Sequence, residues 1–430
     1  MSASVSYPHG LRRMTGRDTT EPHRTATPLE LLFDLTFVAA FGVAGNALAS
    51  SVAHGEVLAG VGAFGFAMVA IVWAWINYSW FASAFDTDDW LFRVLTMVQM
   101  TGVVILAIGL PEMFASLEQG EPVQNEVMVA GYVVMRVAVI AQWMRAAQGN
   151  PVYFAAAKTY ALIIGVAQVG WVLLIFLPLD PLGLLIAALI VSTIDWSSPI
   201  IAEKKGLKHG GATPWHPHHI AERYSLLAII ALGETVLGTL AAAQAITASE
   251  GWTLSSIMVV GLGIVTAFAL WWTYFMLPSA RILAVRRSRA LLWGYAHILV
   301  FGSIAAIGAG LHVIGYAFGD EYHVSTFTAI ASVAIPVVVF MVTLYLLHAW
   351  LVSALPKNAL LQVIVLALPV AAMFFAAIGW PLWVCLLIVT ISPVAVVVRF
   401  EAGSWRSMEV QITRVISGPQ PGTDRAVANG

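Results

Sequence analysis

Two acidic residues lie close together at the start of the first apolar segment of this chain. Glu30 and Asp34 are four residues apart, so in a helix their side chains face the same way. Thr27 can cap such a helix, and the helix dipole favours an acid at Glu30. Asp34 lies a turn deeper among apolar residues, where an ionised carboxylate must find a cation or water. We predict that Glu30 and Asp34 form a polar cluster with Arg93.

Another acid lies much deeper in the apolar part of the sequence. Glu234 falls near the middle of a later apolar segment, close to the centre of a bilayer. A charge at that depth costs roughly 2.5–3.5 kcal/mol on insertion scales. Glu234 is therefore predicted to be protonated, or to pair with Arg136, which sits at a similar depth. Two roles stay open: a buried pair that only joins helices, and a carboxylate that exchanges a proton or cation during transport.

Several other polar side chains are candidates for a substrate or ion path. Glu222 and Arg223 open the segment that carries Glu234, and His297 is a candidate proton carrier in a later segment. The alternative for His297 is a hydrogen-bonded core histidine. Asp195, near the end of an apolar segment, is expected at an interface.

Two groups of residues resemble metal sites, but neither has the spacing of one. The loop Asp86-Thr87-Asp88-Asp89 has no bounded ligand pattern for a divalent ion, so we expect a solvated turn with Asp89 paired to Arg93. The three histidines between 216 and 219 match no closed zinc site. We expect them to form the entry to the next helix, and we expect no metal and no cofactor.

These side chains must be positioned by helices that cross a membrane. The 430 residues are 60% hydrophobic and 10% charged, whereas a soluble domain carries about 25% charged residues. Lipid cannot satisfy open strand edges, and the apolar runs are too continuous for barrel strands. The sequence therefore predicts an all-α, polytopic transmembrane helical bundle.

The apolar runs indicate about twelve spans. They cover approximately residues 29–50, 57–84, 90–111, 124–146, 157–177, 180–200, 219–245, 254–277, 289–316, 326–350, 358–377 and 380–399. We divide the chain into an N-terminal tail (1–28), a first six-helix half (29–200), a linker (201–218), a second six-helix half (219–399) and a C-terminal tail (400–430). Residues 1–28 and the tail after about Arg406 are expected to be mobile.

The basic residues predict how the helices are oriented. Of the 21 Lys and Arg residues, all but Arg136 fall at or beside every second connection between apolar runs. The other connections carry only acids or no charge. Because Lys and Arg stay on the cytoplasmic side when helices insert, we predict that both termini are cytoplasmic. Residues 1–28 lack the apolar core of a signal peptide.

The two halves have similar sequence features. Trp75-Ile76-Asn77-Tyr78 is matched by Trp271-Trp272-Thr273-Tyr274, and each is followed by an arginine that opens the next run, Arg93 or Arg289. Six crossings is an even number, so the second copy would have the orientation of the first. Parallel repeats recur in transporters, with the binding site between the halves near the midplane. We therefore predict two parallel six-helix repeats.

Four stretches carry a resemblance to a known family. Residues 28–38, 75–89, 222–234 and 289–310 are similar to motifs of the bacterial low temperature requirement A family. Leu32 stands where that family leads one to expect phenylalanine, and after residue 320 only hydropathy matches. The resemblance implies a multi-pass inner-membrane protein linked by name to growth in the cold, and it supplies no substrate. The Phe33-Asp34 helix start also resembles lysosomal-type potassium channels built from two six-helix repeats.

Our leading hypothesis is a secondary transporter with a midplane site formed by Glu234 and Arg136. Proton coupling would follow if protonation of Glu234 released Arg136 and favoured one arrangement of the halves. A cation channel is the second hypothesis, and a membrane-embedded enzyme using Glu222, His297 and Asp34 is the third. In a fourth, the polar groups only specify helix packing.

The sequence also indicates which partners to expect. It contains no enzyme signature that we recognise and no nucleic-acid patch, so we expect neither catalysis nor nucleic-acid binding. The expected partners are the lipid bilayer and a small solute or ion of unknown identity. A homo-oligomer is compatible with these features.

Overall fold

Helices make up all of the regular secondary structure described here. The structure is a computed structural model, and it describes all residues except 1–9, 20, 22–23, 320–321, 355–358 and 419–430. Within the described residues every regular element is a helix and none is a strand. The predicted all-α class is therefore confirmed.

Most of these helices are long and apolar enough to cross a bilayer. Among the described residues, eleven candidate spans reach that length and hydropathy. A shorter apolar helix, Gln362–Ala377, occupies the position of the eleventh predicted crossing. These helices confirm the prediction of a multi-pass membrane protein with about twelve spans.

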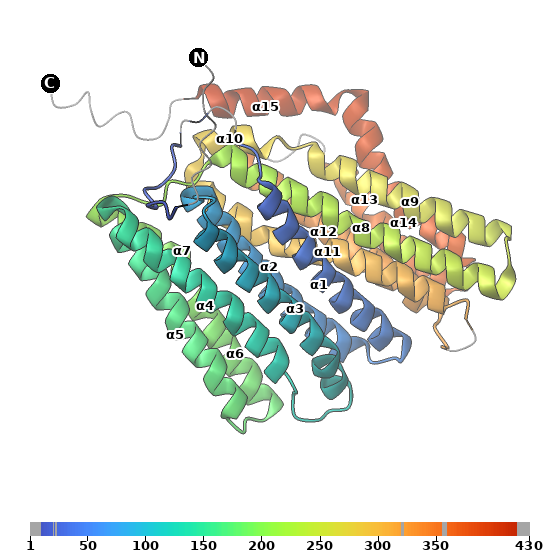
Figure 1. The fold of residues 1–430 in the computed structure, drawn as a ribbon. Helices are drawn as coiled ribbons and strands as arrows, with labels where there is room; N and C mark the ends of the chain where they lie inside the picture. The colour runs from blue at the N-terminus through green and yellow to red at the C-terminus, as the bar shows by residue number, and fades with distance from the viewer. Residues whose placement is uncertain (1–9, 20, 22–23, 320–321, 355–358, 419–430) are drawn as a thin grey trace, which may run out of the picture. The chain divides into compact units, whose positions relative to one another are not determined.

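The chain divides into two compact units, and each is described by itself. Unit 1 comprises Met1–Ala47 and Leu58–Arg223, and unit 2 comprises Leu48–Val57 and Tyr224–Gly430. The helices of unit 1 are the first part of α1 (Pro28–Ala53), α2 (Val57–Phe85), α3 (Trp90–Glu118), α4 (Glu126–Gly149), α5 (Phe154–Phe176), α6 (Pro181–Trp196), α7 (Ser198–His209) and the opening turns of α8 (Pro217–Glu250). Figure 1 shows α4, α5, α6 and α7 running side by side.

Close helix packing in unit 1 depends on glycine. A side chain at Gly131 of α4 would collide with the backbone of Leu106 and Gly102 on α3. Small residues allow helix backbones to approach closely in membranes, where no hydrophobic effect drives helices together. These small residues therefore allow α3 and α4 to pack closely against each other.

Unit 2 contains the remaining helices. After the rest of α8 come α9 (Leu254–Phe275), α10 (Ser279–Val285), α11 (Ala290–Tyr316), α12 (Thr326–Val352), α13 (Ala359–Ala377), α14 (Leu382–Arg399) and α15 (Trp405–Ser417). Helix α11 packs on α12, and α14 packs on α9 and α13. A side chain at Gly308 of α11 would collide with Glu234 of α8, so these two helices also approach closely.

The predicted linker 201–218 is too long. Helix α7 extends to His209, and α8 begins at Pro217, so only residues 210–216 connect them. The apolar run ends near residue 200, but the lysines at 204, 205 and 208 are good helix formers, so the helix continues into the predicted linker. Gly210, with a φ of 144°, follows the last helical residue.

The described part of the N-terminal tail packs against α4 and the turn that follows it, within unit 1. Arg13 donates to the carbonyl of Gly149 at 2.6 Å, and Asn150 donates to the carbonyl of Thr15 at 2.7 Å. The side chain of Met14 is buried. The expectation of a mobile segment before residue 28 is therefore wrong for these residues, because their polar groups bond to the ends of α4 and the following turn.

The predicted C-terminal tail contains a helix. Helix α15 packs on α10, as Figure 1 also shows, and buries Ile412. Arg281 of α10 forms an ion pair with Glu409 of α15 at 3.1 Å. The expected mobility after residue 406 is wrong up to Ser417, since an apolar contact and an ion pair hold this helix. The last predicted tail residues, 419–430, lie outside the described residues.

The order of helix packing is the same in the two units. In unit 1, α3 packs on α4, α4 on α5, and α5 on α6 and α7. In unit 2, α11 packs on α12, α12 on α13, and α13 on α14. The two-repeat architecture stays a prediction, because neighbouring helices in sequence pack together in many helical bundles.

Candidate functional site

Four ionisable side chains meet inside unit 1. We call Glu30, Asp34, His219 and Arg223 the ion cluster. Arg223 Nη1 lies 2.9 Å from Glu30 Oε1, and Arg223 Nη2 donates to Asp34 Oδ1. His219 Nε2 lies 3.2 Å from Glu30 Oε1. All four side chains are fully buried.

Helix α1 positions the two carboxylates as its sequence predicts. Thr27 Oγ1 accepts a hydrogen bond from the Glu30 N–H at 3.3 Å, and Glu30 Oε2 accepts one from the Thr27 N–H at 2.8 Å. This reciprocal capping box fixes the helix start and the Glu30 rotamer together. Asp34, one turn later, is then presented on the same face.

Aromatic rings surround the ion cluster. Trp75 Nε1 donates to Asp34 Oδ1 at 2.6 Å. The Arg223 guanidinium lies 5.7 Å from the Trp75 ring and 5.9 Å from the Tyr78 ring, and Phe33 stacks on Tyr78. Such rings exclude water and favour a cation through their negative faces. The charges therefore interact in a medium of low dielectric constant.

The ion cluster contains more acid than permanent base. Glu30 and Asp34 together carry two negative charges when ionised, and Arg223 carries one positive charge. The net charge is −1 if His219 is neutral, and zero if one proton is bound. Among the described atoms Asp34 Oδ2, His219 Nδ1 and Arg223 Nε have no hydrogen-bond partner. The arrangement can therefore take up a proton without breaking its existing hydrogen bonds.

A second layer of polar groups lies where α2 ends. Arg24 Nη2 donates to the carbonyl of Ala82 at 2.7 Å and lies 3.7 Å from Asp86 Oδ2. The His216 N–H donates to Ser83 Oγ at 3.0 Å, and the His219 N–H donates to His216 Nδ1 at 3.3 Å. His216 thus links the end of α2 to the ion cluster.

Asp86 gives the protein a pH-dependent stability. Burial, and then the charge of Glu30, raise the pKa of Asp86 from 3.8 to about 6, against the opposing effect of Arg24. Between about pH 4 and 6 the folded chain then binds more protons than the unfolded chain, so stability falls as the pH rises through that window.

Replacing Asp86 with asparagine should remove this dependence. The Asp88 N–H, which donates to Asp86 Oδ1 at 2.8 Å, keeps an acceptor in Asp86→Asn. On acidification from above pH 6 to about pH 4, we expect the wild type to gain about 2–3 kcal/mol of unfolding free energy relative to Asp86→Asn. Denaturant titrations in detergent at several pH values measure the difference. Identical pH profiles would contradict the assignment.

Arg93 lies outside the ion cluster. Its guanidinium pairs with Asp88 at 2.8 Å, and both side chains are about half exposed. The expected pairing of Asp89 with Arg93 is also wrong, since Asp89 caps α3 and pairs with Arg145. Burial opposes ionisation of Asp89, but hydrogen bonds from Arg145 and the Phe92 N–H outweigh it and hold its pKa below the usual range.

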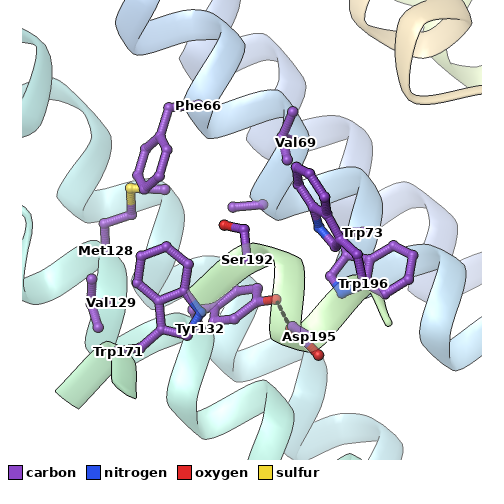
Figure 2. Close-up of a pocket in the computed structure, with 11 residues that line it drawn as sticks. Phe66, Val69, Trp73, Met128, Val129, Tyr132, Trp171, Ser192, Asp195 and Trp196 are labelled. Carbon is purple, nitrogen blue, oxygen red and sulfur yellow. Dashed lines mark hydrogen bonds between the residues drawn. The ribbon is translucent and has the colours of Figure 1, made fainter. Parts of the chain in front are cut away.

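Arg136 pairs with Asp195, and not with Glu234 as the sequence suggested. Arg136 Nη2 donates to Asp195 Oδ1, and the Tyr132 hydroxyl donates to Asp195 Oδ2 at 2.8 Å. Both charged side chains are almost fully buried. The expected depth in the membrane suggested Glu234 as the partner, but Asp195 on α6, in the same unit, supplies the counter-charge of Arg136. Asp195 thus joins α4 to α6, and Figure 2 shows its hydrogen bond with Tyr132.

The other candidates fall in different places. Glu222, half-buried, lies beside Arg223 at the end of unit 1. Glu234 is half-buried on α8 in unit 2. His297, also in unit 2, is buried, with Nδ1 2.8 Å from the carbonyl of Trp293 and Nε2 3.2 Å from the Tyr274 hydroxyl. These bonds are those of a core histidine, the alternative that the sequence left open.

A buried polar chain extends from the ring of Tyr78. Thr96 Oγ1 donates to the Tyr78 hydroxyl at 3.4 Å and accepts from Gln142 Nε2 at 3.3 Å. Gln142 Oε1 in turn accepts from Gln99 Nε2 at 2.9 Å. This series of hydrogen bonds joins α2, α3 and α4. It extends from Tyr78, whose ring lies beside Arg223, to Gln99.

Sequence reasoning missed two members of this site. His219 was considered only as part of a histidine-rich entry loop, and Trp75 only as part of a repeated motif. His219 is four residues before Arg223, so both side chains face the same way on α8. Within the described residues no group of His, Cys, Asp and Glu is arranged to hold a metal ion.

The fold and the site define a multi-pass membrane protein with a buried ion cluster. A family model described as bacterial low temperature requirement A protein matches residues 25–393, and the chain belongs to that family. A similar protein, from Rhizobium meliloti (strain 1021), is 25% identical over 366 residues, covering 80% of this chain and 81% of its own length, and is described as uncharacterized. No solved structure matches the chain.

Proposed function

We propose that this protein is a secondary transporter that exchanges protons for a cationic solute at the ion cluster. The observation that carries the proposal is the charge balance of Glu30, Asp34, His219 and Arg223, all buried in a membrane protein. An uncompensated charge inside a bilayer is costly. The cluster should therefore bind either a proton or another cation, and the two would compete.

The position of the ion cluster along the chain supports a mechanism in which proton binding is coupled to a conformational change. Its side chains come from α1 and α8, and both of these helices continue from unit 1 into unit 2. Arg223 is the last residue of unit 1, and the second segment of unit 2 begins at Tyr224. A proton that changes how Arg223 is held by its carboxylates would act on a helix shared by both units. A ligand shifts a conformational equilibrium only through such differential interactions.

We place the protein in the bacterial inner membrane with both termini cytoplasmic. The support is the family and the confinement of Lys and Arg to alternate connections. The ion cluster, near the start of α1, would then open toward the cytoplasm.

Everted membrane vesicles test the exchange activity. An acridine dye reports the imposed proton gradient, and Na⁺, K⁺ or tetraethylammonium is then added. We expect at least one of these cations to dissipate the gradient in the wild type. His219→Gln and Asp34→Asn should slow that response by ~100-fold, the lower end of what a positioned proton carrier contributes. Arg93→Gln, which alters an exposed pair, should leave it unchanged.

Two results would contradict the proposal. One is a wild type in which none of the three cations dissipates the gradient, or in which the two cluster variants respond normally. The other is the appearance of resolved unitary currents in planar bilayers, because a carrier does not conduct in single-channel steps. Such currents would favour the cation channel instead.

A further inference from the structure

Helix α15 of unit 2 begins close to the point where a membrane-spanning helix ends. The preceding helix, α14, has 18 residues, which at ~1.5 Å per residue span about 27 Å, close to the thickness of the hydrocarbon core. Residues 400–404 then bend the chain, with Gly403 at a φ of 133°, and Figure 1 shows α15 turned away from α14. This geometry brings the start of α15 to the level of the lipid headgroups.

Tryptophans at this end of unit 2 indicate the same level. Trp272 near the end of α9, Trp350 near the end of α12 and Trp405 at the start of α15 are 43%, 43% and 44% exposed. The Trp272 indole N–H donates to Glu401, between α14 and α15, at 3.1 Å. Exposed tryptophans at helix ends are typical of the boundary between hydrocarbon and headgroups.

The apolar face of α15 is wider than the protein surface that covers it. Ile412 is buried where α10 and α12 pack on this helix, but Trp405 and Ile416 stay exposed. Trp405 and Ile416 are eleven residues apart, which is three helical turns, and Ile412 lies one turn before Ile416, so all three share one face. Helices that lie in the plane of the membrane interface bury such a face among the lipids.

Two arginines on α15 have no acidic partner. Arg406 and Arg414 are exposed, and neither forms an ion pair with any residue that the structure describes. The Arg406 guanidinium lies 5.4 Å from the ring centre of Trp405. Glu409, the acid of this helix, is already paired with Arg281. Helix α15 therefore presents two uncompensated positive charges beside its apolar face.

The turn before α11 adds two further positive charges. Arg286 donates to the carbonyl of Leu351 at 2.7 Å and to Ser353 Oγ at 2.8 Å. Arg289 donates to the carbonyl of Trp350, and its guanidinium lies 5.1 Å from the centre of that ring. These partners are neutral, so they leave both charges in place, and each guanidinium has donors to spare. Helix α10 packs on this turn and on α15.

We propose that α15 and the turn before α11 bind the phosphate groups of anionic phospholipids. Arg406 and Arg414 would donate to the phosphate oxygens, for which the fork of a guanidinium is well suited. Trp405 and Ile416 would enter the upper part of the acyl chains. A zwitterionic lipid carries its own ammonium group and would be held less well. The proposal concerns lipid binding alone and does not depend on the transport activity.

Fluorescence quenching in bilayers tests this surface. In the full-length protein Ile416→Cys is labelled with a thiol-reactive nitrobenzoxadiazole dye, since the native Cys385 is buried. Phosphatidylcholine bilayers then receive a small fraction of nitroxide-labelled phosphatidylglycerol or, in parallel, of nitroxide-labelled phosphatidylcholine. At low salt the labelled phosphatidylglycerol should quench about fivefold more strongly, the preference expected from one arginine at an anionic surface. High salt should reduce this preference.

Substitutions on α15 show whether its arginines cause the preference. Arg406→Gln combined with Arg414→Gln should bring the two lipids to within about twofold of each other. Arg406→Lys combined with Arg414→Lys keeps both charges and should keep the preference. Lys204→Gln combined with Lys208→Gln is the matched control, because it removes two exposed charges from α7 in unit 1. This control should behave like the unsubstituted labelled protein.

Three outcomes would overturn the proposal. Equal quenching by the two lipids at low salt would show that the surface does not select anionic headgroups. An unchanged preference in the double glutamine variant would show that the arginines of α15 do not bind them. Quenching by neither lipid would mean that a soluble partner or a second copy of the chain, and not the bilayer, covers α15. Because no proton gradient is present, a failed transport assay would not affect these results.

Discussion

Replacing Arg223 with glutamine is expected to destabilise the protein by about 3–5 kcal/mol, because it leaves buried carboxylates without their permanent cation. Arg223 is fully buried and pairs with both Glu30 and Asp34. Urea titration of the purified protein in detergent measures the loss. Adding Asp34→Asn to Arg223→Gln should recover part of the lost stability, because it removes one of the two carboxylate charges that are left buried without a permanent cation.

The control for this prediction is Arg93→Gln. Arg93 and Asp88 are about half exposed, and exposed pairs contribute ~0.2–1 kcal/mol. If Arg223→Gln destabilised the protein no more than Arg93→Gln, then the carboxylates would not depend on Arg223. The ion cluster would in that case be no more than a solvated group of charges.

Replacing Asp195 with leucine is expected to destabilise the protein by a similar amount, about 3–5 kcal/mol. The substitution leaves Arg136 buried without a counter-charge, and it removes the acceptor of the Tyr132 hydroxyl. Replacing all three polar groups together, as Arg136→Leu, Asp195→Leu and Tyr132→Phe, should return the stability to within about 1 kcal/mol of the wild type. Urea titration measures all of these variants.

The triple variant separates a structural role from a functional one. Arg281→Leu, at the exposed pair with Glu409, serves as the control and should cost less than about 1 kcal/mol. A triple variant as unstable as Asp195→Leu would contradict the account, since it would mean that the pair itself stabilises the fold. If the stable triple variant kept cation–proton exchange, Arg136 would have no part in transport.

Much of the fold could be predicted because lipid imposes a simple rule on the sequence. Long apolar runs must become helices, and the cap formed by Thr27 and Glu30 is local enough to be seen in the chain. The rule says less about polar segments. It could not show that residues 201–209 continue a helix, nor that Arg13 bonds to the end of α4.

Only the part of the candidate site that lies on one helix could be predicted from the sequence. Glu30 and Asp34 share a helix face, which spacing alone requires. Arg223, their partner, is 189 residues from Asp34, and no periodicity reports a pairing over that distance. Arg136 was matched to Glu234 by depth, although Asp195 was the acid that the fold placed beside it. Depth restricts the choice of partners, but tertiary packing decides between them.

The measurement that tests the central claim most directly is infrared difference spectroscopy of the protein in lipid during a shift from alkaline to acidic pH. The account predicts that the ion cluster takes up one proton, seen as carboxylate and imidazole bands that are present in the wild type and in Arg93→Gln. Labelled histidine identifies the imidazole band. In His219→Gln the contribution of the ion cluster to both bands should be lost, whereas the carboxyl band of Asp86 should remain. Difference spectra that are the same for His219→Gln and the wild type would contradict a proton-binding cluster.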